Sequence, residues 1–189
     1  MTGDITIVDD PFDPQGLPRA FDLEGQPSQR VTLIEHGVAK AVVYDSQTAH
    51  RTGQQNTGHA LLPNPFQPAA PMHLRLEPGQ HTRADLIRSC KKGVLVTRFW
   101  YTRWVHQLRT IVTGMTRDGT FAIEDGEIAY PVKNFRFTQS YHEALGGVRG
   151  ISKDLSLLVT GEQFGLMTSC QRVPALHLAA FTFTGSTRY

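Results

Sequence analysis

The chain has 189 residues, of which 40% are hydrophobic and 19% are charged, and its formal net charge is +2. This length fits one large domain or part of a longer protein, and the composition is that of a globular chain with a sizeable core. The basic residues are dispersed along the chain, which argues against a nucleic-acid partner. No apolar run approaches the roughly 20 residues that span a bilayer. The start of the chain lacks a secretory signal. The two cysteines are too few for a disulfide scaffold, so we expect a reducing, cytoplasmic location and no membrane partner.

The first half of the chain predicts short strands joined by turns. Its predicted elements are a strand at 5–8, a hairpin over 30–45 that turns at His36-Gly37, a helix over 46–53 capped by Asp45 or Ser46 and closed by Gly53, and a proline-rich ordered loop over 54–71. Glycine supplies the positive φ that a tight turn and a helix end require. The first strand begins without a preceding helix or cap, as in a domain cut from a longer polypeptide, although a short natural chain would look the same.

The second half continues this pattern, with more hairpin signals. Its predicted elements are a strand over 72–79, a helix from Thr82 to Gly93 with Asp85 as a capping-box partner, a strand over 94–101, strands within 109–128 that turn at Asp118-Gly119 and Asp125-Gly126, an alternating strand over 132–137, a helix capped by Thr138 and ended by Gly146-Gly147, and a closing strand within 173–185. Asp-Gly between apolar runs is a strong hairpin signal. These elements predict an α+β fold with a predominantly antiparallel sheet, curved or barrel-like, and about three short helices. We find no linker or internal repeat, so we expect a single domain over 1–189.

The residues offer little catalytic machinery of their own. Eight histidines invite a metal hypothesis, but no H-E-x-x-H, C-x-x-C or H-x-H motif occurs. His73 and His177 occupy polar-face positions of alternating strands, where a solvent-facing or hydrogen-bonded histidine is expected. His106 is of more interest, because a loop places it near Arg103 and Trp104. The sequence therefore predicts a binding or scaffold module more than a self-contained enzyme.

The two cysteines and one aromatic segment allow other interpretations. Cys90 is interpreted as a small buried helix residue, although the lysines beside it could lower its thiol pKa. Cys170 precedes the closing strand and could reach a cleft. The segment VKNFRF (132–137) mixes charged and aromatic residues, as RNA-binding strands do. An alternating strand with one solvent-facing and one buried face explains this pattern more simply. A basic patch for nucleic-acid binding is missing.

Three segments together resemble a known family. They are TGMTRDGTFAIEDGEIAYPVKNFRFTQSYHEAL (113–145), GLPRAFDLEGQPSQRVTLIEHGVAKAVVYDSQTAHRTGQQNTGHAL (16–61) and RVPALHLAAFTFTG (172–185). They resemble the C-terminal domain of the TldD/PmbA family, zinc metallopeptidases that have also been labelled modulators of DNA gyrase. The resemblance covers nearly the whole chain and rests on long, ordered motifs.

The resemblance implies a metallopeptidase whose H-E-x-x-x-H zinc motif lies in an N-terminal catalytic domain that this chain does not contain. It implies zinc as cofactor, an extended peptide bound along a β edge, and pairing into homo- or heterodimers. Cys170 lies where a zinc-ligand cysteine is expected, although TSCQR lacks the glycine-rich context of that ligand. We expect peptide-cleft residues along the hairpin strip and its flank, namely His106, Thr116, Arg117 and Asp118. The alternative is a non-catalytic partner subunit or binding module of such a heterodimer.

Overall fold

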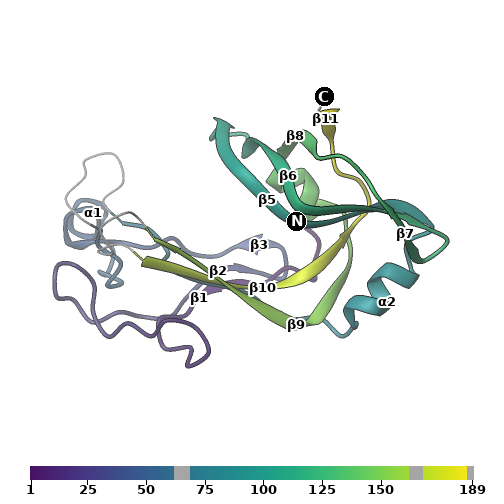
Figure 1. Cartoon of the computed structure of the whole chain (residues 1–189). Coiled ribbons are helices and arrows are strands. Elements are labelled where there is room, and N and C mark those ends of the chain that lie inside the picture. The colour runs from purple at the N-terminus through teal and green to yellow at the C-terminus, as the bar shows by residue number, and fades with distance from the viewer. Residues whose placement is uncertain (62–68, 162–167, 187–189) are drawn as a thin grey trace. The chain divides into compact units, whose positions relative to one another are not determined.

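The computed structural model describes residues 1–61, 69–161 and 168–186 and is mostly β-structure. The strands are β1 (Ile7–Asp9), β2 (Val31–Glu35), β3 (Val38–Ala39), β4 (His73–Leu76), β5 (Lys92–His106), β6 (Ile111–Glu124), β7 (Glu127–Pro131), β8 (Phe135–Ser140), β9 (Val148–Gly161), β10 (Thr168–Leu178) and β11 (Phe183–Ser186). The helices are α1 (Ser46–Thr52), α2 (Arg83–Arg88) and α3 (Tyr141–Gly146). The predicted fold class, mainly antiparallel sheet with about three short helices, is confirmed (Figure 1). Among the described residues neither sheet closes into a barrel.

The strands form two sheets. One has six strands in the order β3-β2-β1-β4-β10-β9, and its β10–β4 pair is parallel. The other has the order β11-β8-β6-β5, with β7 also paired to β6. The chain divides into two compact units: unit 1 contains 1–2, 79–154 and 175–189, and unit 2 contains 3–78 and 155–174. Each unit is described below by itself, and a single domain over 1–189 stays a prediction.

Several turns and caps form where the sequence predicts them. His36-Gly37 and Asp125-Gly126 both have two consecutive positive φ values, as two-residue hairpins require. Asp45 caps α1, and Gly53 ends it in the left-handed conformation. Thr82 and Asp85 form the predicted capping box of α2.

Other boundaries differ from the prediction. Asp118-Gly119 is not a hairpin turn. It is an irregularity inside the single strand β6, where Thr97 of the neighbouring strand β5 donates a hydrogen bond to the Gly119 carbonyl at 2.9 Å. The α3 cap is Ser140 rather than Thr138, because the Ser140 hydroxyl accepts from the Glu143 amide. α2 ends at Arg88, with Ser89 as its C-cap, well before Gly93. Part of the predicted loop over 54–71, residues 62–68, lies outside the described residues.

Each unit has its own apolar core. In unit 2, Ile5 and Val8 are almost fully buried. In unit 1, Phe137 is 1% exposed and its ring meets Phe99 edge-on at 4.7 Å between centroids. Edge-on aromatic pairs of this kind add to the stabilisation from burial alone.

Candidate functional site

The four predicted cleft residues all lie on β5 and β6 of unit 1, in different surroundings. Thr116 is 1% exposed, and its hydroxyl accepts from the Phe135 amide at 2.9 Å and from the Thr120 hydroxyl at 2.8 Å. It therefore joins β8 to β6 from within the core. His106 is exposed, and its Nδ1 accepts from the Arg109 amide in the turn after β5.

Arg117 and Asp118 lie on the exposed surface of the same hairpin. Asp118 pairs with Arg98 at 2.7 Å, and the guanidinium carbons of Arg98 and Arg117 lie 4.8 and 4.6 Å from the Trp100 ring centroid. Two cations against one indole hold this ring in place on the surface. The structure thus gathers Arg117 and Asp118 with Arg98 and Trp100, while Thr116 is buried. His106 is the last residue of β5, so its predicted position in a loop is wrong. Their role in peptide binding stays a prediction.

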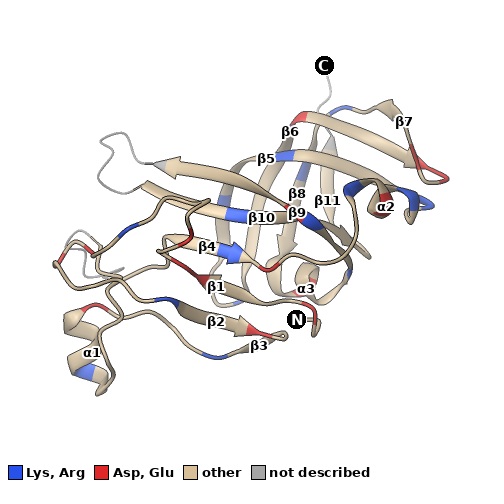
Figure 2. Cartoon of the chain, turned by 90° about the horizontal axis from the view of Figure 1, so that it is seen from below, with Lys and Arg blue, Asp and Glu red and all other residues tan. Residues whose placement is uncertain are grey.

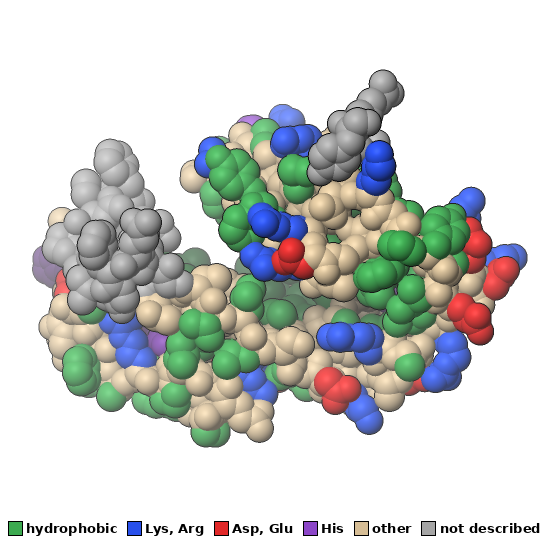
Figure 3. Space-filling model, in the orientation of Figure 1, with side chains coloured by type: hydrophobic (Ala, Val, Ile, Leu, Met, Phe, Trp, Pro, Cys, Tyr) green, Lys and Arg blue, Asp and Glu red, His purple; other side chains and the backbone are tan. Residues whose placement is uncertain are grey.

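Aromatic side chains are exposed along the second half of β5. They are Phe99, Trp100, Tyr101 and Trp104, with exposed fractions from 43% to 60%. Figure 3 shows hydrophobic and basic side chains interspersed on this part of unit 1. Tyr101 has a φ of +55°, and the register with β6 shifts between Trp100 and Arg103. Bulges of this kind re-aim side chains at the edge of a sheet.

Cys170, the predicted zinc ligand, lies inside β10 of unit 2 and is 3% exposed. Its backbone is opposite His73 in the parallel pair, and its amide donates to the Met72 carbonyl at 2.8 Å. Burial raises the pKa of the thiol, and the negative charges of Asp9 and Asp13 add to this rise, against a backbone hydrogen bond from Leu17 and the charge of Arg172. The surroundings thus favour the protonated thiol.

A buried polar cluster beside Cys170 was not predicted. Asp9 is fully buried, its Oδ1 accepts from the His73 amide at 2.6 Å, and its Oδ2 lies 2.7 Å from His59 Nε2. The imidazole of His73 is also buried, with Nδ1 4.0 Å from Asp9 Oδ2, so the expected polar-face position of His73 is wrong: its side chain points into the protein. Burial, together with the charges of Arg19 and His59, lowers the pKa of His73 against the opposing effect of Asp9 and Asp10.

The His59 ring is fixed from its other side as well. Its Nδ1 lies 2.8 Å from the Thr57 carbonyl and 2.9 Å from the Thr57 hydroxyl oxygen. That hydroxyl donates to the Tyr44 carbonyl, so its oxygen is an acceptor toward the ring. Both ring nitrogens therefore lie within hydrogen-bond distance of oxygen atoms, which fixes the orientation of the ring. No local sequence signal joins these residues, because Asp9 and His59 are separated by 50 positions.

An ion network borders the cluster. Asp13 is bound by Arg172 and lies 3.5 Å from Arg75, which also binds Glu77 at 2.8 Å. Figure 2 shows the basic positions of β4 and β10 on these two paired strands. Burial raises the pKa of Asp13, but hydrogen bonds from Arg172 and the Gln15 amide and the charges of Arg172 and Arg75 outweigh it, so the net pKa lies below its usual 3.8. The carboxylate is thus held ionised in a partly desolvated place.

The described residues do not fit a complete zinc site. No three of their histidine, cysteine, aspartate and glutamate side chains converge as a metal site needs. The Asp9 carboxylate is instead hydrogen-bonded by His59 and by the His73 amide, and the His59 ring by Thr57, which is the pattern of a structural polar core. Among the described residues, no helix is long and apolar enough to cross a membrane.

The whole of this mostly β chain matches one metallopeptidase family. The family described as "PmbA/TldA metallopeptidase C-terminal domain" matches residues 1–185. The chain therefore belongs to the PmbA/TldD metallopeptidase family, as its C-terminal domain.

Individual relatives agree with this assignment. The chain is 29% identical over 164 residues to a Methanothermobacter thermautotrophicus metalloprotease, covering 81% of the chain and 34% of the relative. It is 25% identical over 162 residues to a Buchnera aphidicola metalloprotease TldD homolog, covering 80% and 32%. The chain thus spans about a third of the length of these curated relatives.

Solved structures share the fold. TldE from Thermococcus kodakarensis superimposes with a TM-score of 0.80 at 24% identity, over 97% of this chain and 40% of that one. A proposed modulator of a DNA gyrase from Thermotoga maritima gives a TM-score of 0.75 at 20% identity, over the same shares of the two chains, 97% and 40%.

Proposed function

We propose that this domain serves a zinc metallopeptidase acting on extended or unfolded peptides, to which it contributes a peptide-binding edge and dimer contacts. Zinc and the water-activating glutamate would belong to an N-terminal catalytic domain, with at most Cys170 supplied from here. The observation that carries the proposal is the edge strand β5, with family membership as its context.

β5 is 15 residues long and ends its sheet, with β6 on one side only among the described residues. An antiparallel edge strand presents alternate N–H and C=O groups outward, and an extended peptide can pair with them whatever its sequence. Natural sheets usually blunt such edges with short strands, proline, charges or bulges. β5 is bulged from Val96 onward, but its regular segment 93–96 contains neither proline nor charge, so this part of the edge is suited to a partner strand.

The outward groups of β5 follow from its pairing. The Asp125 amide donates to the Lys91 carbonyl at 2.8 Å, and Gly93 lies opposite Ile123 two residues on. Hydrogen-bonded pairs alternate along an antiparallel ladder, so the amide of Val94, between two such pairs, points away from β6. This amide is a donor for an added strand.

Val94 also provides the test. In the full-length protein, Val94→Pro removes the outward amide, whereas Val94→Thr replaces the same side chain and keeps the amide. We expect Val94→Pro to weaken binding of a fluorescein-labelled unstructured peptide, measured by anisotropy, and Val94→Thr to leave it unchanged. Equal binding by both variants and the wild type would remove β5 from the peptide site.

Cys170 is tested separately by metal content. In the full-length protein, Cys170→Ser should lower bound zinc if its thiolate is a ligand, while Cys90→Ser, which alters the other free cysteine, should not. Full zinc content in Cys170→Ser would assign the thiol to the core of unit 2.

The buried, protonation-favouring surroundings of Cys170 support the alternative function, a non-catalytic partner subunit of a heterodimer. In that case the edge strand would contact the catalytic partner. Peptide cleavage by the purified full-length protein without a second subunit would favour the metallopeptidase. Absence of cleavage would favour the non-catalytic partner subunit.

A further inference from the structure

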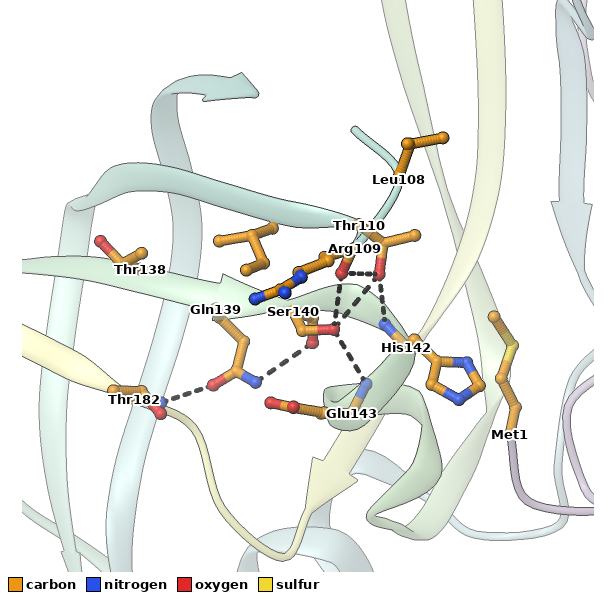
Figure 4. A pocket seen from close by; sticks show the side chains of 11 residues that line it. Met1, Leu108, Arg109, Thr110, Thr138, Gln139, Ser140, His142, Glu143 and Thr182 are labelled. Carbon is orange, nitrogen blue, oxygen red and sulfur yellow. Dashed lines mark hydrogen bonds between the residues drawn. The ribbon is translucent and has the colours of Figure 1, made fainter. Parts of the chain in front are cut away.

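A pocket of about 610 Å³ lies within unit 1, beside the turn between β5 and β6, the end of β8 and the start of α3 (Figure 4). This volume falls in the range of roughly 300–1,000 Å³ that small-molecule sites usually have. Its lining combines apolar Leu108 and Ile111 with charged Arg109 and Glu143. The pocket takes no part in the function proposed above.

The two charged side chains are available to a ligand. Neither the Arg109 guanidinium nor the Glu143 carboxylate has a hydrogen bond or salt bridge within the described part of the chain. In Figure 4 both charged groups point in the same direction, on either side of Ser140. Opposite charges that line one pocket without pairing can each bind a group of a third molecule.

One buried hydroxyl holds the backbones of both charged residues. Ser140 is 8% exposed, and its Oγ donates to the Arg109 carbonyl at 3.2 Å and accepts from the Glu143 amide at 3.3 Å. The two positions are thus fixed relative to each other before any ligand arrives, which lowers the entropic cost of binding.

Two further residues of the pocket lining, Thr110 and Gln139, are also held in place by hydrogen bonds. Thr110 has a φ of +53°, an uncommon conformation for a β-branched residue, and its hydroxyl donates to the Arg109 carbonyl at 2.7 Å. Strained backbone of this kind collects at ligand sites. Gln139 is 6% exposed, donates to the Ser140 carbonyl at 3.1 Å and accepts from the Thr182 amide at 2.8 Å. Both the nitrogen and the oxygen of its side-chain amide are therefore hydrogen-bonded, which fixes this part of the pocket lining.

We propose that this pocket binds a small zwitterion of the amino-acid and short-peptide class, with its carboxylate on Arg109 and its ammonium group on Glu143. The planar guanidinium matches a carboxylate in a two-point hydrogen bond. A carboxylate of the protein suits an ammonium group, and Leu108 and Ile111 offer apolar surface to the ligand's side chains. A ligand with a single charge would leave one of the two protein charges unpaired.

The test is calorimetry on the full-length protein with three probes: trialanine, N-acetyl-trialanine and trialanine amide. Trialanine carries both charges, and each capped form lacks one. We expect each capped form to bind about tenfold more weakly, as the loss of one charge-assisted hydrogen bond implies. Alanine itself serves as a shorter zwitterion to define the size of the ligand. Absence of binding by both trialanine and alanine would overturn the proposal, as would equal affinity for capped and uncapped forms.

Two substitutions assign the charges to their partners. Arg109→Gln should weaken trialanine and N-acetyl-trialanine but not trialanine amide, whereas Glu143→Gln should weaken trialanine and trialanine amide but not N-acetyl-trialanine. Arg149→Gln, at an exposed arginine that does not line the pocket, is the matched control and should change none of them. Circular dichroism establishes that each variant is folded. Wild-type affinity in both pocket variants would place the ligand elsewhere. Because binding is measured without proteolysis, failure here is distinguishable from failure of the peptidase proposal.

Discussion

Asp9 should be among the most costly residues to replace in unit 2. Its carboxylate is fully buried and accepts from the His73 amide at 2.6 Å and from His59 Nε2 at 2.7 Å. In Asp9→Ala both donors remain buried without acceptors, at about 1–3 kcal/mol each. We therefore expect the free energy of unfolding to fall by about 2–6 kcal/mol, a large part of the roughly 5–15 kcal/mol of a typical domain.

The assay is urea unfolding followed by circular dichroism, with midpoint and slope fitted together. Asp4→Ala is the matched control, because Asp4 is exposed, and should change stability by less than about 0.5 kcal/mol. Asp9→Asn is the finer variant. Its amide oxygen can still accept from the His73 amide, and its amino group can donate to His59 Nε2 when the ring proton lies on Nδ1, toward the Thr57 carbonyl. It should therefore cost clearly less than Asp9→Ala. A cost below about 1 kcal/mol for Asp9→Ala would refute the idea that the cluster is a structural polar core.

Three further predictions use equilibrium unfolding. Burial lowers the pKa of His73 below 6.5, so as the pH falls the unfolded state binds a proton on this residue before the folded state does. The free energy of unfolding should therefore be highest above pH 6.5 and decline as the pH falls below it. His73→Gln should flatten this decline. Gly58 and Gly53 both have a positive φ, for which alanine is expected to cost about 1–2 kcal/mol. Gly58→Ala should cost clearly more than Gly53→Ala, because only a Cβ at Gly58 would lie 2.2 Å from the Pro27 carbonyl oxygen. Equal costs would contradict the steric argument. Thr82→Ala removes the α2 cap and should cost about 1 kcal/mol, while no loss would mean that packing alone holds the helix.

Local chemistry predicted the turns and caps better than the strand pairing. Asp125-Gly126 and Asp118-Gly119 are the same dipeptide within strand-forming sequence, yet only the first reverses the chain. The difference comes from the neighbouring strand: β5 pairs with β6 on both sides of Asp118-Gly119, and the Thr97 hydroxyl donates to the Gly119 carbonyl there. The strand β9 was not among the predicted elements, since its sequence has no hairpin signal that would delimit it.

The sites were less predictable than the fold. The place of Thr116 in the hairpin strip predicts a cleft residue, but a threonine in an alternating strand can face either side, and here it faces the core. The Asp9–His59 contact and the pocket around Ser140 join residues from distant segments, and sequence spacing carries no information on such contacts. The family resemblance indicated the architecture, but it indicated neither the Asp9–His59 contact nor the pocket around Ser140.

The parallel pair of β4 and β10 has a consequence for how the chain is made. Its register sets His73 beside Cys170, so β4 obtains this neighbour only after nearly the whole domain has been synthesised. On the ribosome, β1 can pair with β2 and with β4 early, but the other edge of β4 stays unpaired until β10 is made. Such late, long-range pairing slows folding and leaves an open backbone on which nascent chains can associate. A stop codon placed before Thr168 would therefore uncover the middle of the sheet in unit 2, far from the place of the truncation in the sequence.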